Sequence, residues 1–215
     1  NYEYIIIDGD SKDETLKKIN KYKNKIHKII SEKDNGIYYA MNKGIKLAKG
    51  DVIVFCNSGD FFYKNSLKKV IKLFKNFKYD FVFGTVIRNY KRGGKIHKHG
   101  FNFQRMLYNF DFATSHTTGF FLKKNVYKEI GLYDTKFKCS ADYDLYYRLY
   151  KGKYKGGSTK KHQVRGNVAS GGYSSTFTFL DHIAEESKIR LKNKQNFIFV
   201  LIIFVNAFIK KLFKT

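Results

Sequence analysis

The sequence predicts an α/β fold, in which a mostly parallel β-sheet carries helices on both faces. Between residues 2 and 87, short β-prone runs alternate with segments whose apolar residues recur every three or four positions, as in a helix with one buried face. The run DVIVF (51–55) is continuously apolar, which is typical of a strand covered on both sides. The chain has 215 residues, 43% of them hydrophobic, which is enough for one sizeable core.

The first half of the chain alternates strand and helix. YEYIIID (2–8) is β-prone and leads into a segment where Ser11 and Glu14 stand in capping-box register. Strands are expected at 2–8, 28–31, 51–55 and 80–87, and helices at 11–25, 37–48 and 65–77. Such alternation is typical of parallel strands joined by helical crossovers.

The pattern changes after residue 88. Gly93 and Gly94 suit a hairpin turn. A strand is expected at 119–123, and helices at 141–152 and 175–193. No repeat or low-complexity linker interrupts the chain, so we expect one domain at 1–195, followed by a distinct apolar segment at 196–215.

The C-terminal segment has a composition of its own. FIFVLIIFVNAFI (197–209) is strongly apolar, and lysine or arginine residues flank it on both sides. It is shorter than the roughly 20 residues that a membrane-crossing helix needs. An apolar helix with cationic flanks suits burial in the membrane interface. A helix packed in the core and a truncated membrane span are the alternatives.

The charge balance is extreme: 42 Lys and Arg against 18 Asp and Glu give a net charge of +24. This charge favours anionic partners, which include nucleic acid, phospholipid headgroups and phosphorylated small molecules. A Lys/Asn/Ile/Phe/Tyr-rich composition explains part of the excess equally well. Cys56 and Cys139 have no metal-type spacing and imply no disulfide framework, so a reducing compartment is expected.

Three aspartates, Asp8, Asp34 and Asp60, fall at or just after the ends of strand candidates. In doubly wound sheets, ligands bind outside the carboxyl ends of the strands. Asp60 ends the run VIVFCNSGD (52–60), so it is either a turn residue or a carboxylate that serves a ligand at this edge. Periodicity alone leaves both interpretations open.

Several motifs, taken in order, resemble bacterial family 2 glycosyltransferases of the GT-A fold. IIIDGDSKDET (5–15) is similar to the family's second strand and Asp-rich turn, and SEKDNGIYYAMNKGIKLAKGDVIVFCNSGD (31–60) is the most specific match. SHTTGFFLKKNVYKEIGLYDTKFKCSADYDLYYRL (115–149) resembles the acceptor-side segment, and GGYSS (171–175) resembles a C-terminal Gly/Ser element. The resemblance implies a GT-A-like fold, related to the Rossmann fold, that lacks the family's first strand and helix.

The resemblance implies a divalent cation, manganese or magnesium, bound at Asp60. The diphosphate of a nucleotide-sugar leaves with negative charge, which a cation held by carboxylates neutralises. The family usually presents two or three aspartates at this strand end. Here Asn57 and Gly59 stand where many relatives have Asp, so Asp60 is the only carboxylate of the motif.

The resemblance also assigns residues to the donor and the acceptor. Asp8 is similar to the residue that contacts the base, and Asp34 and Asn42 lie in the segment that lines the nucleoside. A carboxylate that accepts the imide N–H of uracil favours a UDP-sugar. Asp142 resembles the catalytic base, which takes the proton of the acceptor hydroxyl in a single inverting displacement.

Other charged residues near these motifs are expected to have structural roles. Asp144 points about 200° away from Asp142 on the same helix. We expect Asp144 to form an ion pair with Arg148, four residues on. Lys43 is expected to be a solvated surface lysine.

Together these observations predict an inverting, metal-dependent transferase that moves a sugar from a UDP-sugar to a glycan or lipid-linked acceptor in cell-surface polysaccharide biosynthesis. The basic surface and apolar tail place it at the cytoplasmic face of the bacterial inner membrane, where anionic lipids attract lysine clusters. The alternatives are an inactive or truncated homologue and a basic protein that binds membrane or nucleic acid. Nucleic acid is not expected, because Lys and Arg are spread along the chain and no nucleic-acid motif occurs.

Overall fold

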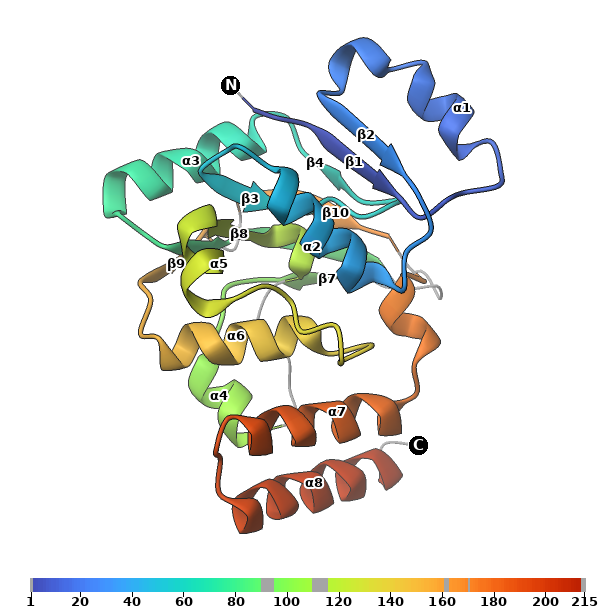
Figure 1. Ribbon diagram of the computed structural model, residues 1–215. Helices are drawn as coiled ribbons and strands as arrows, with labels where there is room; N and C mark the ends of the chain where they lie inside the picture. Colours follow the sequence, from blue (N-terminus) through green and yellow to red (C-terminus); the bar gives the residue numbers. More distant parts are fainter. Residues whose placement is uncertain (1, 90–94, 110–115, 161–162, 170, 214–215) are drawn as a thin grey trace.

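The predicted α/β class is confirmed: helices cover both faces of mixed β-sheets (Figure 1). The structure, a computed structural model, describes residues 2–89, 95–109, 116–160, 163–169 and 171–213. The strands are β1 (Ile5–Asp8), β2 (Lys28–Ser31), β3 (Val52–Val54), β4 (Phe61–Phe62), β5 (Phe81–Phe83), β6 (Thr85–Asn89), β7 (Lys95–Lys98), β8 (Phe120–Lys123), β9 (Gly156–Ser158) and β10 (Val164–Val168).

These strands form three sheets. β1 and β2 pair with each other, β3-β8-β5-β9 form a four-stranded sheet, and β4-β10-β6-β7 form another. The pairs β1–β2, β5–β9 and β6–β10 are parallel. β8 lies between β3 and β5 and is antiparallel to both. Strands joined only by helical crossovers would all be parallel, so this sheet is not a simple parallel one.

The helices are α1 (Thr15–Asn20), α2 (Ile37–Leu47), α3 (Ser66–Phe77), α4 (Phe103–Tyr108), α5 (Lys124–Ile130), α6 (Ala141–Lys151), α7 (Phe179–Lys192) and α8 (Phe197–Leu212). The 3₁₀ turns are η1 (Lys23–Lys25), η2 (Thr117–Gly119) and η3 (Tyr173–Thr176). α2, α3, α6 and α7 lie within the helices expected from the sequence. The predicted hairpin turn at Gly93 and Gly94 falls outside the described residues, and the flanking strands β6 and β7 pair antiparallel.

The central four-stranded sheet is buried on both faces because alternate residues of its strands point to opposite sides. Phe81 and Phe83 of β5 pack into a large core together with α2, α5 and α6. Val82, between them, packs with Phe121 and with α3 on the other face. This double coverage explains why the run DVIVF and the strands beside it are apolar throughout.

The strand predicted at 80–87 is two strands. The Gly84 N–H donates to the Gly119 carbonyl oxygen at 2.7 Å, and the chain passes from β5 in one sheet to β6 in another at this point. The apolar pattern continues across the break, and so it does not reveal the change of sheet. The bond also holds η2 against the sheet.

The helix predicted at 11–25 is shorter than expected, and its predicted capping box is wrong. α1 begins at Thr15 after Glu14, with no side-chain cap bond. The Ser11 hydroxyl donates to Asp8 Oδ1 at 2.6 Å instead. A buried carboxylate that needs donors competes with the helix N-terminus for this serine. A complete capping box occurs at Thr178 and Asp181, at the start of α7.

α2 joins the β1–β2 sheet to the central sheet. Among the described residues, no strand pairs with both β1 and β3. Gly44 of α2 lies over Ile7 of β1 and Phe55 beyond β3, which would be 3.7 and 3.9 Å from a Cβ at this position. Tyr38, Met41 and Ile45 on the same helix are part of the large core. The position of β1 and β2 therefore depends on this helix.

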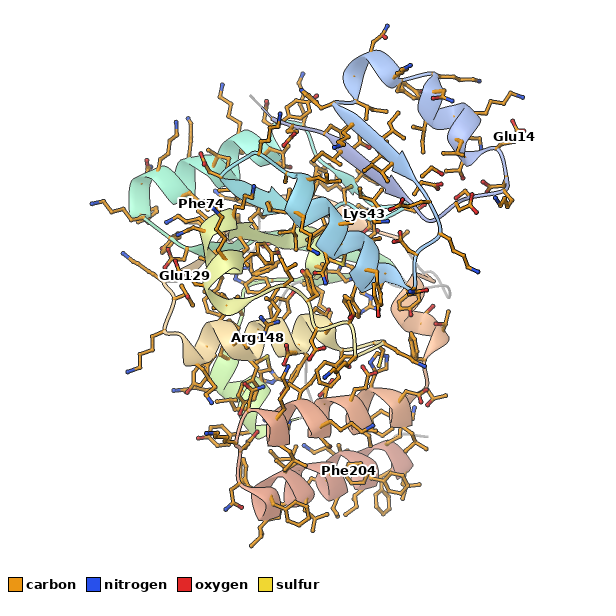
Figure 2. The ribbon with its side chains drawn as sticks, in the orientation of Figure 1. Glu14, Lys43, Phe74, Glu129, Arg148 and Phe204 are labelled. Carbon is orange, nitrogen blue, oxygen red and sulfur yellow. The ribbon has the colours of Figure 1, made fainter. Side chains whose placement is uncertain are left out.

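The predicted i,i+4 ion pair on α6 is confirmed and extends to α7. Asp144 is fully buried and accepts from Arg148 Nε at 2.8 Å and from Lys192 Nζ at 2.9 Å. Arg148, labelled in Figure 2, also donates to the carbonyl oxygens of Ile130, Gly131 and Leu132. Asp144 thus fixes three segments to one another.

α8 is the outermost element and packs along α7 (Figure 1). Phe204 lies between the two helices (Figure 2). Val200 and Ile203 of α8 are buried, whereas most of its other apolar side chains are exposed. No helix in the described part of the chain combines the length and the apolar character that a membrane crossing requires.

Replacing Asp144 with alanine should lower the free energy of unfolding by about 3 kcal/mol, because Arg148, whose side chain is only 18% exposed, loses its carboxylate partner, whereas Lys192 keeps Asp134. Urea denaturation followed by circular dichroism measures the loss. Asp51→Ala, at an exposed aspartate beside β3, is the matched control and should change stability by less than about 0.5 kcal/mol. Equal losses in the two variants would contradict the assigned role.

Candidate active site

Two carboxylates predicted to be functional, Asp60 and Asp142, are held by adjacent residues of η2. The Thr118 hydroxyl donates to Asp60 Oδ2, and the Thr117 hydroxyl donates to Asp142 Oδ2 at 3.4 Å. Asp60 follows β3, and Asp142 is the second residue of α6. The structure therefore brings together two acids that lie more than eighty positions apart in the sequence.

Asp60 lies in a half-buried position at the end of a tight turn. Its backbone N–H donates to the Asn57 carbonyl oxygen at 2.9 Å. Its Oδ1 accepts from the Ala169 N–H at 2.9 Å, just after β10. Burial raises the pKa of the Asp60 carboxyl, although the bonds from Thr118 and Ala169 act in the opposite direction. The ionised carboxylate is therefore less well stabilised here than it would be in water.

The backbone at Gly59 disfavours an acid at this position of the motif. Its φ is +84°, in the region that glycine adopts freely and other residues rarely do. A Cβ here would come within 3.0 Å of the Ala169 side chain. The turn that directs Asp60 toward Thr118 thus disfavours a second side chain at position 59.

The environment of Asp60 fits a cation that the protein holds through one carboxylate. Among the described residues, no Lys, Arg or His pairs with it, and no group of three or more His, Cys, Asp and Glu could hold a metal ion. Magnesium is commonly held by one or two carboxylates, with substrate phosphates and water as the other ligands. Asp60 is the residue that fits this arrangement.

Asp142 sits at the N-terminal end of α6, where its carboxylate faces several donors. Oδ1 accepts from the Tyr143 N–H at 2.9 Å and from the Tyr38 hydroxyl at 3.4 Å. Burial raises the pKa of Asp142 from 3.8 to about 6, against the effect of these bonds. The carboxylate is therefore ionised at neutral pH and basic enough to hold a proton, as a general base requires.

Glu185 of α7 positions the backbone just before α6. Its Oε2 accepts from the N–H groups of Cys139 and Ser140, both at 2.9 Å, and its Oε1 accepts from the Lys138 N–H at 2.6 Å. Three amides of one loop thus converge on one carboxylate. This loop leads directly to Asp142, so Glu185 helps to set where the Asp142 carboxylate lies.

Asp8 is buried at the carboxyl end of β1, and its carboxylate organises the loop that follows. Oδ2 accepts from the Ser31 hydroxyl at 2.6 Å and from the N–H groups of Asp10 and Ser11 at 3.1 and 3.0 Å. Burial raises the pKa of Asp8, but the bonds from Ser11 and Ser31 outweigh it, and the net shift is downward. Oδ1 accepts only from Ser11 among the described residues.

Asp34 has an oxygen with no partner. Its side chain is 10% exposed, and Lys43 Nζ donates to Oδ1 at 2.8 Å. Oδ2 is buried without a hydrogen-bond partner in the described structure. An orphaned buried acceptor is costly unless a ligand or water satisfies it. Asp34 thus has a buried oxygen that a ligand or a water molecule could satisfy.

Lys43 is not the solvated lysine that the sequence suggested. It lies on α2 beside the carboxyl end of β2 (Figure 2) and forms ion pairs with both Glu32 and Asp34. The Asn42 amide forms two bonds with the Tyr133 backbone, at 2.8 and 2.9 Å. Asn42 therefore ties α2 to the loop before α6, and its contact with a nucleotide stays a prediction.

Sequence reasoning missed Thr117, Thr118, Tyr38 and Glu185. Each contacts its partner through the fold and not through local spacing. His116, directly before η2, accepts from the Thr118 N–H through its Nδ1 at 3.3 Å. Burial, followed by the charges of Arg88 and Lys98, lowers the pKa of His116 to about 4. It is neutral at physiological pH and caps η2.

Known proteins share this sequence pattern. The sequence profile of glycosyl transferase family 2 matches residues 1–132. The chain belongs to glycosyl transferase family 2. The matched range contains Asp8, Asp34 and Asp60 and ends before Asp142.

Curated relatives of this family 2 chain include the PGL/p-HBAD biosynthesis glycosyltransferases of Mycobacterium bovis and Mycobacterium tuberculosis. Each is 28% identical over 158 residues, which is 70% of the chain and 59% of the relative. The chain thus spans about three fifths of the length of these relatives.

Solved structures with the same fold include S. aureus TarS in complex with UDP-GlcNAc, with a TM-score of 0.68 and 16% identity. The match covers 96% of the chain and 62% of the TarS chain. TarS in complex with UDP gives a TM-score of 0.65 and 15% identity, covering 96% of the chain and 61% of that structure. At these identities the comparison shows a common fold.

Replacing Glu185 with glutamine should lower kcat about tenfold or more, because a glutamine amide presents an N–H₂ group to backbone donors and displaces the loop before Asp142. The KM for the donor should stay within about twofold, and the pH at which kcat is half-maximal should move, since the surroundings of Asp142 change. Transfer rates measured across a pH series test both effects.

Glu129→Gln is the matched control for this experiment. Glu129 is exposed on α5 (Figure 2). Its carboxylate accepts from the Tyr154 hydroxyl at 2.7 Å. Its variant should keep the parent's kcat and pH profile. If Glu185→Gln behaves like Glu129→Gln, the positioning role is wrong.

Proposed function

We propose that this chain is an inverting glycosyltransferase that moves a sugar from a nucleotide-sugar donor, a UDP-sugar, to a hydroxyl of a glycan or lipid-linked acceptor. The observation that carries the proposal is the placement of Asp142 and Asp60 on adjacent threonines of η2. Membership of glycosyl transferase family 2 favours it over a basic protein that binds only membrane or nucleic acid.

Asp142 is the proposed general base. Its carboxylate takes the proton of the acceptor hydroxyl while the hydroxyl oxygen bonds to the anomeric carbon. The bond from that carbon to the donor's phosphate oxygen breaks, and the nucleoside diphosphate leaves with the electron pair. A single displacement from the opposite side inverts the anomeric configuration. Thr117 and Tyr38 orient the carboxylate for this step.

Asp34 and Asp8 are the proposed donor-side carboxylates. The unpartnered Asp34 Oδ2 can accept a hydrogen bond from the nucleoside, and Asp8 Oδ1 keeps a lone pair for the base. An accepting carboxylate matches the imide N–H of uracil. The structures of TarS with UDP-GlcNAc and UDP support the choice of a UDP-sugar. Asn42 shapes this side through Tyr133.

Asp60 is the proposed ligand of a divalent cation, manganese or magnesium. Bound there, the cation would neutralise the charge of the leaving diphosphate as a Lewis acid. Thr118 and Ala169 hold the Asp60 carboxylate in place. A site with one protein carboxylate leaves the remaining ligands to the donor's phosphates and water, so cation and donor should bind together.

The proposed setting is cell-surface polysaccharide biosynthesis at the cytoplasmic face of a bacterial inner membrane. The curated relatives are named for PGL/p-HBAD biosynthesis, which supports a role in glycan assembly. The charge of +24 favours an anionic surface and a phosphorylated donor.

Asp142→Asn should lower the transfer rate about 100-fold or more, because the amide cannot accept the proton. UDP binding, measured by calorimetry, should not change. In the parent, activity should rise as pH rises through about 6, where Asp142 ionises. Transfer at the parent's rate by Asp142→Asn would overturn the assignment of the base.

The same variant should be more stable than the parent at neutral pH. The pKa of Asp142 is raised in the folded state, so ionisation above pH about 6 penalises folding, whereas below 3.8 the carboxyl is protonated in both states. The stability gain of Asp142→Asn should therefore be largest above pH 6 and should disappear as the pH falls toward 3.8. Urea denaturation at several pH values measures this difference.

Asp60→Asn should abolish the dependence of donor binding on the cation. In the parent, manganese should tighten UDP binding about tenfold or more, since one carboxylate and the diphosphate share the ion. In the variant, UDP affinity should be the same with manganese and with chelator. Asp51→Asn, at the opposite end of β3, should behave like the parent. Full manganese dependence in Asp60→Asn would place the cation elsewhere.

A further inference from the structure

The outer face of α8 is an apolar surface that nothing in the described structure covers. It consists of large side chains that are between 41% and 84% exposed: Phe197, Ile198, Leu201, Ile202, Val205, Phe208, Ile209, Leu212 and Phe213. We propose that this surface, called here the α8 face, docks on an anionic lipid bilayer, with α8 lying along the membrane plane.

Both sides of α8 are apolar, which is unusual for a helix at a protein surface. The inner side packs on α7 through the buried residues Val200 and Ile203. The outer side carries the exposed set, and before the lysines of the last turn its exposed polar residue is Asn206. An apolar patch of this extent marks a surface that meets a lipid or protein partner.

The charges around the α8 face favour anionic lipid. Exposed lysines stand at both ends of the helix: Lys194 before it, and Lys210 and Lys211 in its last turn. The sequence has no Asp or Glu after Glu186. Lysine side chains can extend their ammonium groups to lipid headgroups while their apolar stems stay at the interface.

A second copy of this chain is a poorer occupant of the same surface. In a parallel pair, each cationic end would meet the same end of the partner. In an antiparallel pair, Lys194 would meet Lys210 and Lys211. With no acid in this segment to compensate, both arrangements bring like charges together, which opposes association.

The geometry favours a helix that lies flat. α8 has 16 residues, and its length of about 24 Å follows from a rise of 1.5 Å per residue. α7 packs against one side of this helix. Only the outer side is free to enter the lipid, to the shallow depth typical of interfacial helices.

The apolar surface continues beyond α8 onto α4. Tyr108 is exposed and meets Phe199 edge to face, with ring centroids 5.4 Å apart. A cavity of about 290 Å³ opens here, lined by Leu107, Tyr108, Tyr147, Gln195, Asn196 and Phe199. Tyrosine is enriched at membrane interfaces, where its ring meets the acyl region and its hydroxyl meets water.

This inference goes beyond sugar transfer and does not depend on it. If both hold, docking sets the orientation of the active site, because α7 lies between the membrane surface and α6. Lys192 of α7 pairs with Asp144 of α6, and Glu185 of α7 holds the loop before Asp142. The acceptor would then approach Asp142 in a fixed orientation.

A tryptophan placed on the α8 face provides a direct test, because the chain contains no Trp. Leu201→Trp reports from the α8 face, and Phe77→Trp, at the end of α3, is the matched control: both positions are 49% exposed. Each is mixed with vesicles of phosphatidylcholine alone, or of phosphatidylcholine and phosphatidylglycerol in equal parts. We expect a blue shift of emission for Leu201→Trp with the anionic vesicles, and none for Phe77→Trp.

Co-sedimentation with the same vesicles tests which residues carry the binding. Ile198→Ser/Ile202→Ser/Ile209→Ser removes exposed apolar area without emptying the core, and its partitioning should fall at least about tenfold at an unchanged melting temperature. Lys194→Gln/Lys210→Gln/Lys211→Gln should lose the preference for phosphatidylglycerol. Unchanged binding in both variants would overturn the proposal. So would a parent that ignores anionic vesicles and forms a dimer which the serine variant dissociates in analytical ultracentrifugation.

Discussion

The candidate site depends on holding two partly buried carboxylates, Asp60 and Asp142, on adjacent residues of η2. Neither Asp60 nor Asp142 has an ion-pair partner among the described residues, and burial raises the pKa of both. Hydroxyl donors from η2 and α2 and the amide of Ala169, just after β10, compensate only in part. The elements that deliver these donors must therefore meet at one point, and the break at Gly84 places η2 there.

The sequence predicted those parts of the fold and the site that depend on local spacing. Alternating apolar runs identified the strands and helices of the α/β class, and the spacing of Asp144 and Arg148 predicted their ion pair. Acids that follow strands pointed to Asp8, Asp34 and Asp60. Each of these features is determined by residues only a few positions apart in the sequence.

The remaining features depend on contacts between distant segments. The sequence around Glu185 does not indicate that its carboxylate accepts hydrogen bonds from three backbone N–H groups of a loop more than forty positions away. Ser11 had a local role as a helix cap and a competing one as a donor to Asp8, and the buried carboxylate prevailed. Lys43 appeared to be one surface lysine among many until the fold placed Glu32 and Asp34 around it.

The separate β1–β2 sheet has a consequence for how this molecule moves. Asp8 and Asp34 stand on this unit, whereas Asp60 and Asp142 stand on the central sheet and α6, and α2 is a packed connection between the two. A unit with few ladder bonds to its neighbours can open at a lower free energy than the rest of the protein. A bound donor that contacts both sets of acids would hold the two parts together, so donor binding would be coupled to the order of the β1–β2 unit.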